Sequence, residues 1–465
     1  MPPAADAPLT DAYLDPAAFL RRESFHRSVT FTPSYLSSAA PPSSSSVDAP
    51  PREFTTTYAV AGFVPPSSSS SSSDEPPKDP PTVVWLNGLG HHRLAAMLFD
   101  GLFASRGVRL ITLDRPGAGR STPCPLGVRV KTAHEALLAV LEKEGVSEFS
   151  LLSHSNGVIY ALYSLLHFPP ASSSSSSAPS PSAPRILSWT LSSPYVPPWH
   201  SSHLLLSAAR YIPPSLTSHL GGLATGAQRV LEPFAKSAGW SAGVSGAVKE
   251  LGAMAWGSSA GFVSPGTAAA EGASAGGEGD GAAEPPTPTE AEALAQRARF
   301  RDLNAARPRH KRLFGGEFYG PSLFGRGMKV AMREGLDGMG QEALICLRQG
   351  EAGGTGAWFG EEVEDGAAEG ELLERAFKAV KERWAAEGRE AIPMRVVYGK
   401  EDGLVPAKGR AYLRCLLVDQ LGLVDAAHWT EVDDAAHDDD LGLSCVIEPY
   451  LEDLLAIHAA AAAKE

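Results

Sequence analysis

The chain has 465 residues, enough for about three domains or for one large domain with insertions. Apolar residues, at 43%, suffice for a sizeable core, and a formal charge of -13 argues against nucleic acid as the main partner, because phosphate binding needs a cationic surface. Four cysteines without a CxxC pair indicate neither a disulfide framework nor a metal site, and they favour a reducing compartment.

Targeting and membrane signals are not visible in the sequence. The first residues lack the basic and apolar regions of a signal peptide. No run of about 20 apolar residues occurs, so we predict no transmembrane segment. We therefore expect a cytoplasmic protein.

Serine and proline are concentrated in a few tracts. Such tracts carry too little apolar surface to offset the entropy of ordering, so we predict disordered loops there. They lie near residues 35–52, 65–80 and 171–184, and an Ala/Gly/Glu/Pro-rich loop follows near 265–288.

Short apolar runs alternate with amphipathic segments between these tracts. The predicted strands are 27–32, 53–63, 82–86, 108–114, 149–152, 186–191, 394–398 and 429–432. The predicted helices are 94–105, 130–144, 156–168, 408–421 and 441–461. Short strands that are apolar on both faces and separated by helices are typical of a parallel sheet covered on both sides. We expect an α/β fold whose first two strands form an antiparallel edge.

One strand runs directly into a helix at Ser155. A nucleophile held on such a strained turn needs small residues two positions before and after it, and here these are Ser153 and Gly157. The other interpretation is that Ser155 only caps the helix, a position that serine suits well.

Two later residues have the order and position of a base and its orienting acid. A serine hydroxyl is a weak nucleophile without such partners. Asp402 follows the strand at 394–398, and His437 follows the strand at 429–432. The carboxyl ends of parallel strands share one edge of a sheet, so we expect Ser155, Asp402 and His437 to meet there.

Three neighbouring residues are weaker candidates. Glu401 could replace Asp402, but the spacing to Pro406 favours Asp402. His428 precedes its strand and so falls at the wrong end of the sheet. His154 is expected to point away from the nucleophile, and the acidic residues around His437 are expected to form a solvated loop. The pair His91-His92 has no partner at metal-ligand spacing, so we predict no metal site.

Five segments, taken in order, resemble the α/β-hydrolase superfamily of capped serine hydrolases. They are Asn87-Gly88-Leu89-Gly90, the loop from Asp114 to Ser121, the elbow at Ser155, the turn with Gly399, Asp402 and Pro406, and His437. The resemblance covers roughly residues 53–198 and 391–462. It implies an α/β-hydrolase fold with a mostly parallel eight-stranded sheet flanked by helices, and it implies no cofactor.

The resemblance also implies roles for individual residues. Ser155 would be the nucleophile, His437 the general base and acid, and Asp402 the residue that orients His437. The backbone N–H groups of Leu89 and Asn156 would form the oxyanion hole. Asn87, which precedes Gly88 in the loop, stands where the family usually has histidine, so it would organise the loop rather than react.

The family often carries a helical cap between its sixth and seventh strands. We accordingly divide the chain into an N-terminal extension (1–23), a first core part (24–198), a cap (199–390) and a second core part (391–465). Within the cap, Thr289-x-x-Glu292 is a capping box that opens a helix. The cap also has apolar segments such as 228–256. Its aromatic residues indicate either a hydrophobic substrate tunnel or ordinary packing within the cap; they are Trp240, Trp256, Phe318, Tyr319 and Phe324.

The resulting hypothesis is a serine hydrolase that cleaves an ester-type bond of a fairly apolar small-molecule or lipid substrate. A C–C bond hydrolase, a thioesterase, an amidase or an acyltransferase would use the same triad. Epoxide hydrolase and haloalkane dehalogenase chemistry is disfavoured, because it needs a carboxylate at the elbow. A non-catalytic binding protein with this fold is the alternative from another class. The basic segment 297–312 indicates either a solvated helix face or a patch for an anionic substrate or a peripheral membrane contact.

Overall fold

The computed structural model of the chain describes residues 11–37, 53–63, 79–168, 184–218, 289–313, 322–335, 337–349, 358–359 and 371–463. The predicted loops near 35–52, 65–80, 171–184 and 265–288 lie almost wholly outside these ranges. So do the segment 228–256 and the residues Trp240, Trp256, Phe318 and Tyr319, and the side chain of Phe324 is not described.

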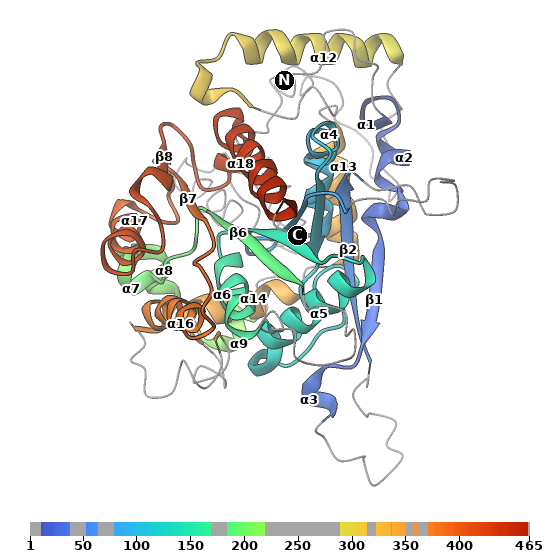
Figure 1. Cartoon of the computed structure of the whole chain (residues 1–465). Coiled ribbons are helices and arrows are strands. Elements are labelled where there is room, and N and C mark those ends of the chain that lie inside the picture. The colour runs from blue at the N-terminus through green and yellow to red at the C-terminus, as the bar shows by residue number, and fades with distance from the viewer. Residues whose placement is uncertain are drawn as a thin grey trace, which may run out of the picture.

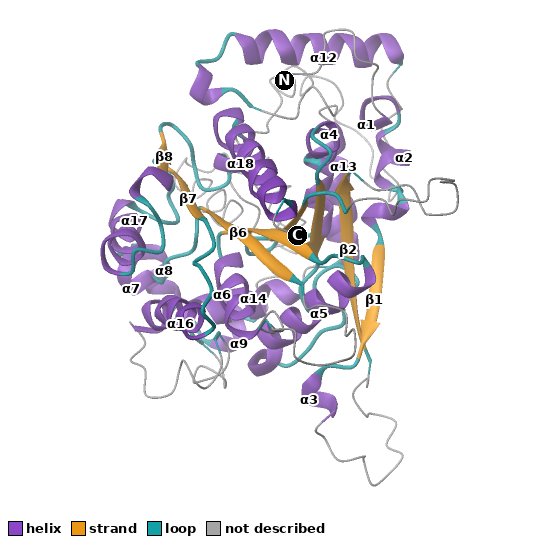
Figure 2. Cartoon of the chain, viewed as in Figure 1, coloured by secondary structure: helices purple, strands orange, loops and turns teal. Residues whose placement is uncertain are grey.

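Eight strands form one sheet, in the order β1-β2-β4-β3-β5-β6-β7-β8 (Figures 1 and 2). Their bounds are Arg27–Phe31 (β1), Phe54–Gly62 (β2), Thr82–Leu86 (β3), Arg109–Leu113 (β4), Glu148–His154 (β5), Arg185–Ser192 (β6), Met394–Gly399 (β7) and Trp429–Val432 (β8). β2 pairs antiparallel with β1 and with β4, and every other neighbouring pair is parallel. The predicted mostly parallel eight-stranded sheet with an antiparallel edge is confirmed.

The strand order reverses direction around β3. β3 lies between β4 and β5, so the chain moves outward in one direction from β3 to β4 and in the other from β5 to β8. The loops after β3 and β5 consequently leave the same edge of the sheet side by side. In open α/β sheets this switch point is where ligands and catalytic groups are usually placed.

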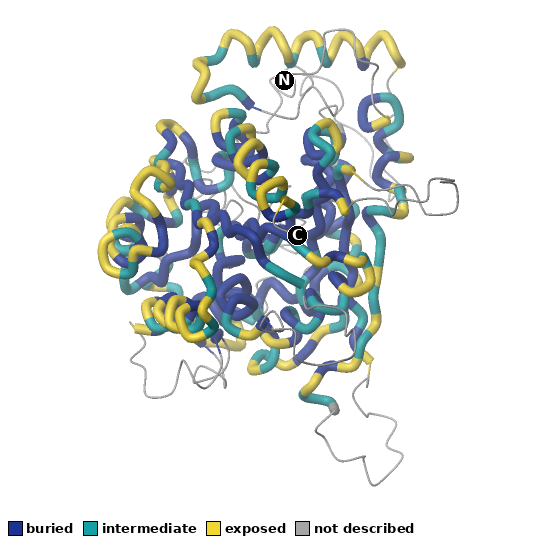
Figure 3. The backbone as a smooth tube through the Cα atoms, viewed as in Figure 1, coloured by how far each residue is buried: buried dark blue, intermediate teal, exposed yellow. Residues whose placement is uncertain are grey.

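Helices cover both faces of the sheet, and each face has its own apolar core. The first face is covered by α5 (Arg129–Lys143), α6 (Gly157–His167), α14 (Gly338–Leu347), α16 (Leu372–Ala386) and α17 (Ala407–Arg414). The second face is covered by α1 (Asp11–Leu14), α2 (Pro16–Leu20), the 3-10 helix η2 (Arg93–Leu98), α4 (Asp100–Ser105), α13 (Ser322–Glu334) and α18 (Ser444–Ala462). Figure 3 shows the central strands buried, whereas the edge strands β1 and β8 are only partly buried.

The remaining elements are short, apart from α12. They are η1 (Glu23–Phe25), α3 (Ser34–Ser37), η3 (Leu126–Val128), α7 (Pro198–Ser201), α8 (Leu204–Ala209), α9 (Pro214–Thr217), α12 (Glu290–Ala305), η6 (Arg309–Lys311), the π-helical turn η8 (Cys415–Gln420), η9 (Ala426–His428) and η10 (Asp440–Gly442). Two predicted helices are therefore each split: 94–105 into η2 and α4, and 408–421 into α17 and η8. The last helix begins at Ser444 rather than at 441, because residues 440–442 form a 3-10 turn.

The described part of the 199–390 insertion has two different environments. α12 opens with the predicted capping box, in which Thr289 Oγ1 accepts from the Glu292 N–H and the Glu292 carboxylate accepts from the Thr289 N–H. Only Ala293 of this helix is buried, and α12 runs along the top of the molecule in Figure 1, exposed in Figure 3. α14, in contrast, is buried along nearly its whole length beside the core.

Candidate active site

The turn between β5 and α6 has the strained geometry of a nucleophile elbow. Ser155 has a backbone φ of 51°, in the left-handed region that residues other than glycine rarely adopt. A Cβ on Gly157 would lie 2.1 Å from the Leu86 carbonyl oxygen of β3, so only glycine fits there. Ser153, where the motif usually has glycine, accepts a hydrogen bond from Trp189 Nε1 at 2.8 Å. The neighbouring strand therefore accommodates the extra side chain.

Three residues far apart in the sequence lie in one hydrogen-bonded row at the carboxyl edge of the sheet. His437 Nε2 is 2.9 Å from Ser155 Oγ, and His437 Nδ1 is 2.8 Å from Asp402 Oδ2. The other carboxylate oxygen of Asp402 accepts from the backbone N–H groups of Leu404 and Val405, at 2.9 and 2.8 Å. Asp402 and His437 are both buried. The acid is thus fixed by the turn after β7, and it holds the imidazole toward Ser155.

The two weaker candidates for acid and base do not join this row. Glu401 is exposed, and its backbone N–H donates to Ala435 O. His428 is exposed and ends η9 just before β8, at the far end of that strand from His437.

The acidic residues around His437 form the expected solvated loop only before it, where they are exposed; those after it are not solvated. Asp440 is fully buried and accepts from the hydroxyls of Ser192 and Ser193, at 2.9 and 3.2 Å. Burial raises the pKa of Asp440 to about 6. Asp438 pairs with His154, whose Nε2 lies 2.8 Å from Asp438 Oδ1.

These carboxylates change the electrostatics at His437. Burial favours the neutral imidazole, but the adjacent charge and hydrogen bond of Asp402 outweigh it, and Asp438 and Asp440 add to the effect. Together they raise the pKa of His437 to about 9. An imidazolium that forms at this position is therefore strongly stabilised.

The loop after β3, residues 87–90, packs directly against the elbow. A Cβ on Gly88 would lie 3.2 Å from Ser155 Cβ, so the backbone there approaches the nucleophile closely. Asn87 is buried and donates from Nδ2 to Thr112 Oγ1 at 2.7 Å, which ties the loop to β4. The backbone N–H groups of Leu89 and Asn156 donate to no other residue in the described ranges. Both donors therefore stay available to a ligand.

Arg115 connects the two backbone segments that carry these N–H groups. Its guanidinium donates to the Gly88 carbonyl oxygen at 3.3 Å and to Asn156 Oδ1 at 3.1 Å. The Gly88 carbonyl and the Leu89 N–H belong to one planar peptide unit and point in opposite directions. Holding the carbonyl thus fixes the direction of the Leu89 N–H.

Glu342, on α14 of the insertion, fixes Arg115 and Asn156 in place. Its carboxylate accepts from Arg115, from Asn156 Nδ2 at 3.0 Å, from Arg129 Nε at 2.7 Å and from the Tyr160 hydroxyl at 2.6 Å. Burial alone would raise the carboxyl pKa, but the two guanidinium charges lower the pKa of Glu342 to about 2. The sequence carries no signal for this residue, because a single glutamate in an apolar helix has no motif around it.

One group of side chains that could bind a metal ion has its negative charge balanced by an arginine. Donor atoms of His92, Asp114 and Glu334 lie within 4.8 Å of one another. The buried Arg93 guanidinium contacts both carboxylates, at 2.5 Å to Asp114 and 2.6 Å to Glu334. This cluster is therefore a buried ion-pair network that joins η2 and β4 to α13.

Comparisons with known proteins give matches at the level of structure. No protein-family model matches the sequence, and no curated protein sequence does. A mutant epoxide hydrolase from Vigna radiata is similar over 93% of this chain and 98% of its own, with 13% identity and a TM-score of 0.41. A thermophilic esterase from Thermogutta terrifontis is similar over 92% and 99%, with 11% identity and a TM-score of 0.41. An esterase from Exiguobacterium antarcticum covers 87% and 95%, with 11% identity and a TM-score of 0.38.

The fold assignment rests on the chain's own features. The strand order places β3 between β4 and β5, and the sheet has the antiparallel edge that the pattern of its first two strands predicted. A left-handed Ser155 stands between β5 and α6, and a backbone loop packs against it. The chain has the α/β-hydrolase fold.

Proposed function

We propose that the chain is a serine hydrolase that cleaves an ester-type bond of a fairly apolar small-molecule or lipid substrate. The observation that carries the proposal is the unbroken row from Ser155 Oγ through His437 to Asp402, with hydrogen bonds of 2.9 and 2.8 Å. The positive φ of Ser155 supports it, because a helix cap alone needs no such strain.

Acylation would begin with attack by Ser155 Oγ on the substrate carbonyl carbon. His437 Nε2 takes the hydroxyl proton as the new C–O bond forms, and Asp402 stabilises the imidazolium that results. The carbonyl oxygen becomes an oxyanion, and the N–H groups of Leu89 and Asn156 donate to it. His437 then gives its proton to the leaving alcohol as the ester bond breaks, which leaves an acyl group on Ser155.

Deacylation would repeat these steps with water. His437 removes a proton from the water while its oxygen attacks the acyl carbon, and the same N–H groups stabilise the second oxyanion. The proton returns to Ser155 Oγ as the acid leaves. The same residues would serve a C–C bond hydrolase if the leaving group were a carbanion, a thioesterase if it were a thiolate, and an amidase if it were an amine. With an alcohol in place of water, they would serve an acyltransferase.

A fluorophosphonate probe tests the proposal, because it phosphonylates only an activated serine. Wild type should be labelled, and Ser155→Ala should abolish labelling. Ser105→Ala, at the exposed end of α4, is the matched control and should label like wild type. A correctly folded wild type that stays unlabelled would favour the non-catalytic binding protein. A series of p-nitrophenyl esters of increasing chain length would then measure the preference for apolar acyl groups.

We also propose a peripheral membrane contact through the basic segment 297–312. No helix in the described part of the chain is long and apolar enough to cross a bilayer. α12 exposes Leu294 and Leu303 alongside its arginines, the combination that favours an anionic membrane surface. Flotation with vesicles should show binding that requires anionic lipid and weakens when Arg299 and Arg301 are both changed to glutamate. The cytoplasmic location stays a prediction.

A further inference from the structure

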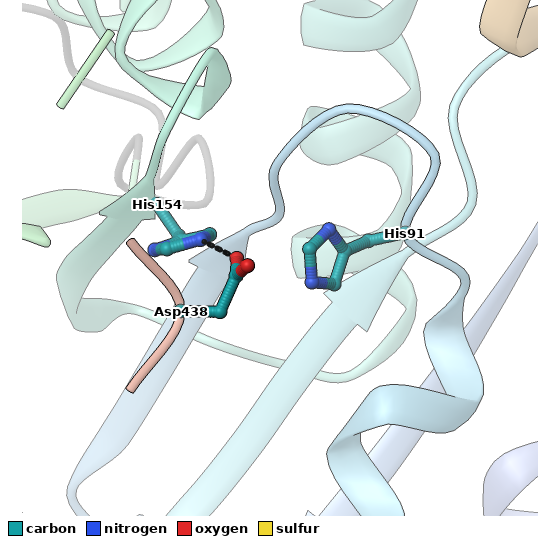
Figure 4. Close-up of side chains that lie close together, drawn as sticks. All are labelled: His91, His154 and Asp438. Carbon is teal, nitrogen blue, oxygen red and sulfur yellow. Dashed lines mark hydrogen bonds and ion pairs between the residues drawn. The ribbon is translucent and has the colours of Figure 1, made fainter. Parts of the chain in front are cut away.

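Two imidazoles and one carboxylate converge beside the elbow from three separate segments. His91 lies in the loop after β3, His154 ends β5, and Asp438 follows His437 after β8. One donor atom of each lies within 4.8 Å of the other two. Figure 4 shows the Asp438 carboxylate between the two rings, with its hydrogen bond to His154.

Part of this cluster has unmet polar groups. His91 Nδ1 and Asp438 Oδ2 are both buried, and neither has a hydrogen-bond partner among the described residues. A buried polar atom without a partner costs about 1 to 3 kcal/mol, so each of these two residues has hydrogen-bonding or ligand capacity that a bound ligand would use.

The hydrogen bonds around His154 determine which of its nitrogens faces the cluster. Ser192 Oγ donates to Asp440, so it accepts from His154 Nδ1, 2.9 Å away. That leaves His154 Nε2 to face Asp438 Oδ1 at 2.8 Å. A proton or a metal ion must lie between them, because two lone pairs repel. Histidines that bind metal ions usually have their other ring nitrogen held by a hydrogen bond of this kind.

We propose that His91, His154 and Asp438 bind one divalent first-row cation of the Zn²⁺ type, with at least one coordination position open to water. Two imidazoles and a carboxylate are a donor set that Zn²⁺ takes in proteins, at about 2.0 to 2.2 Å from each atom. Ligand atoms around such an ion are roughly 3.4 Å apart. His154 Nε2 and Asp438 Oδ1 would move apart from 2.8 Å, and the His91 donor atom, now within 4.8 Å, would move in, so displacements of about an ångström would form the site.

The cation would lie next to the proposed triad and would oppose its chemistry. The His154 ring is 5.3 Å from the His437 ring, measured between centroids. A double positive charge there disfavours the imidazolium that His437 forms in the transition state, and it removes the negative charge of Asp438. We therefore expect the bound cation to inhibit. This consequence rests on the proposed function, whereas the binding itself does not.

Cobalt titration of untagged, chelator-treated protein tests the site, because Co²⁺ in an N/O site of low coordination number absorbs visible light. We expect one equivalent to bind to wild type, Zn²⁺ to displace it, and Ser155→Ala to bind equally well. Asp438→Asn and His91→Gln should each weaken binding by at least about 100-fold. His428→Gln and Asp433→Asn, which change an exposed histidine and an exposed aspartate outside the cluster, are the matched controls and should bind like wild type.

The outcomes separate the two proposals. A wild type that takes up no stoichiometric cobalt, or that binds it as tightly after both Asp438→Asn and His91→Gln, overturns the metal site and indicates that only a proton joins His154 to Asp438. Circular dichroism shows whether a variant misfolds. Even then, the wild-type titration alone decides whether the protein binds one equivalent of the metal ion. Fluorophosphonate labelling of the same metal-free protein reports on the proposed reaction separately. Labelling that falls as Zn²⁺ fills the site supports the inhibition.

Discussion

Replacing Glu342 with glutamine tests whether the insertion is bound to the catalytic core by charge. The change keeps the size of the side chain and removes its negative charge. Both arginines then lose the carboxylate that balances their charge. Arg129 is fully buried, and the side chain of Arg115 is only 12% exposed. Removing one partner of a buried ion pair typically costs about 3 to 5 kcal/mol.

The pKa of Glu342 gives a second route to the same magnitude. A carboxyl group with a folded pKa of about 2 and an ordinary value of 4.5 is shifted by roughly 2.5 units, or about 3 kcal/mol. Because the folded pKa is lowered, this stability is fully present above the unfolded value. It is lost as the pH falls from about 4.5 toward 2. The gap between wild type and Glu342→Gln should therefore be largest near neutral pH and should shrink in acid.

Urea unfolding measures the difference. We expect Glu342→Gln to lose about 3 kcal/mol of unfolding free energy at pH 7. The matched control is Glu382→Gln, on the exposed face of α16, where an ion pair with Lys378 is long and solvated. It should change stability by less than about 0.5 kcal/mol. A Glu342→Gln protein within 1 kcal/mol of wild type at pH 7 would refute the reasoning.

The remaining predictions concern the elbow, the oxyanion donors and the base. Arg115→Lys should lower kcat by about 10- to 100-fold with a smaller change in KM, because a single ammonium cannot hold the Gly88 carbonyl and Asn156 at once. Equal changes in kcat and KM in steady-state assays would contradict this. In chelator-treated protein, kcat/KM should rise with pH through a pKa well above 6.5, because His437 must lose its proton to act as a base and its carboxylate neighbours favour the charged form. Asp402→Asn should move that pKa downward as it lowers the rate, and an unmoved pH profile would speak against the assignment. Gly157→Ala should abolish activity and lower Tm, because its Cβ meets a β3 carbonyl oxygen, whereas Gly403→Ala, with nothing within 4 Å, should melt like wild type.

Local sequence patterns predicted the sheet well. Each predicted strand agrees with the structure to within a few residues, because short apolar runs bounded by turns depend mainly on neighbouring residues. The order Ser155, Asp402, His437 was visible for a similar reason, since each residue follows a strand whose end can be located. The structure brings these side chains within hydrogen-bonding distance, as expected.

Tertiary packing decided what the sequence could not. The acids after His437 look like a solvated run, but Asp440 is buried by contacts with serines at the end of β6. His91 gave no metal pattern, because its neighbours in space come from β5 and from the loop after β8. Glu342 and Arg115 lie 227 positions apart, and neither sits in a motif that indicates the other.

The burial of α14 limits how a substrate can reach Ser155. Lifting this helix would separate Glu342 from two guanidinium groups, at a free-energy cost of about 3 kcal/mol or more. At that cost, the helix would be lifted in fewer than roughly one molecule in a hundred at any moment. An access route that opens during turnover must therefore leave α14 in place. A shortened enzyme made by deleting the whole of residues 199–390 would lose the carboxylate beneath the oxyanion donors, whereas one that keeps 337–349 would retain it.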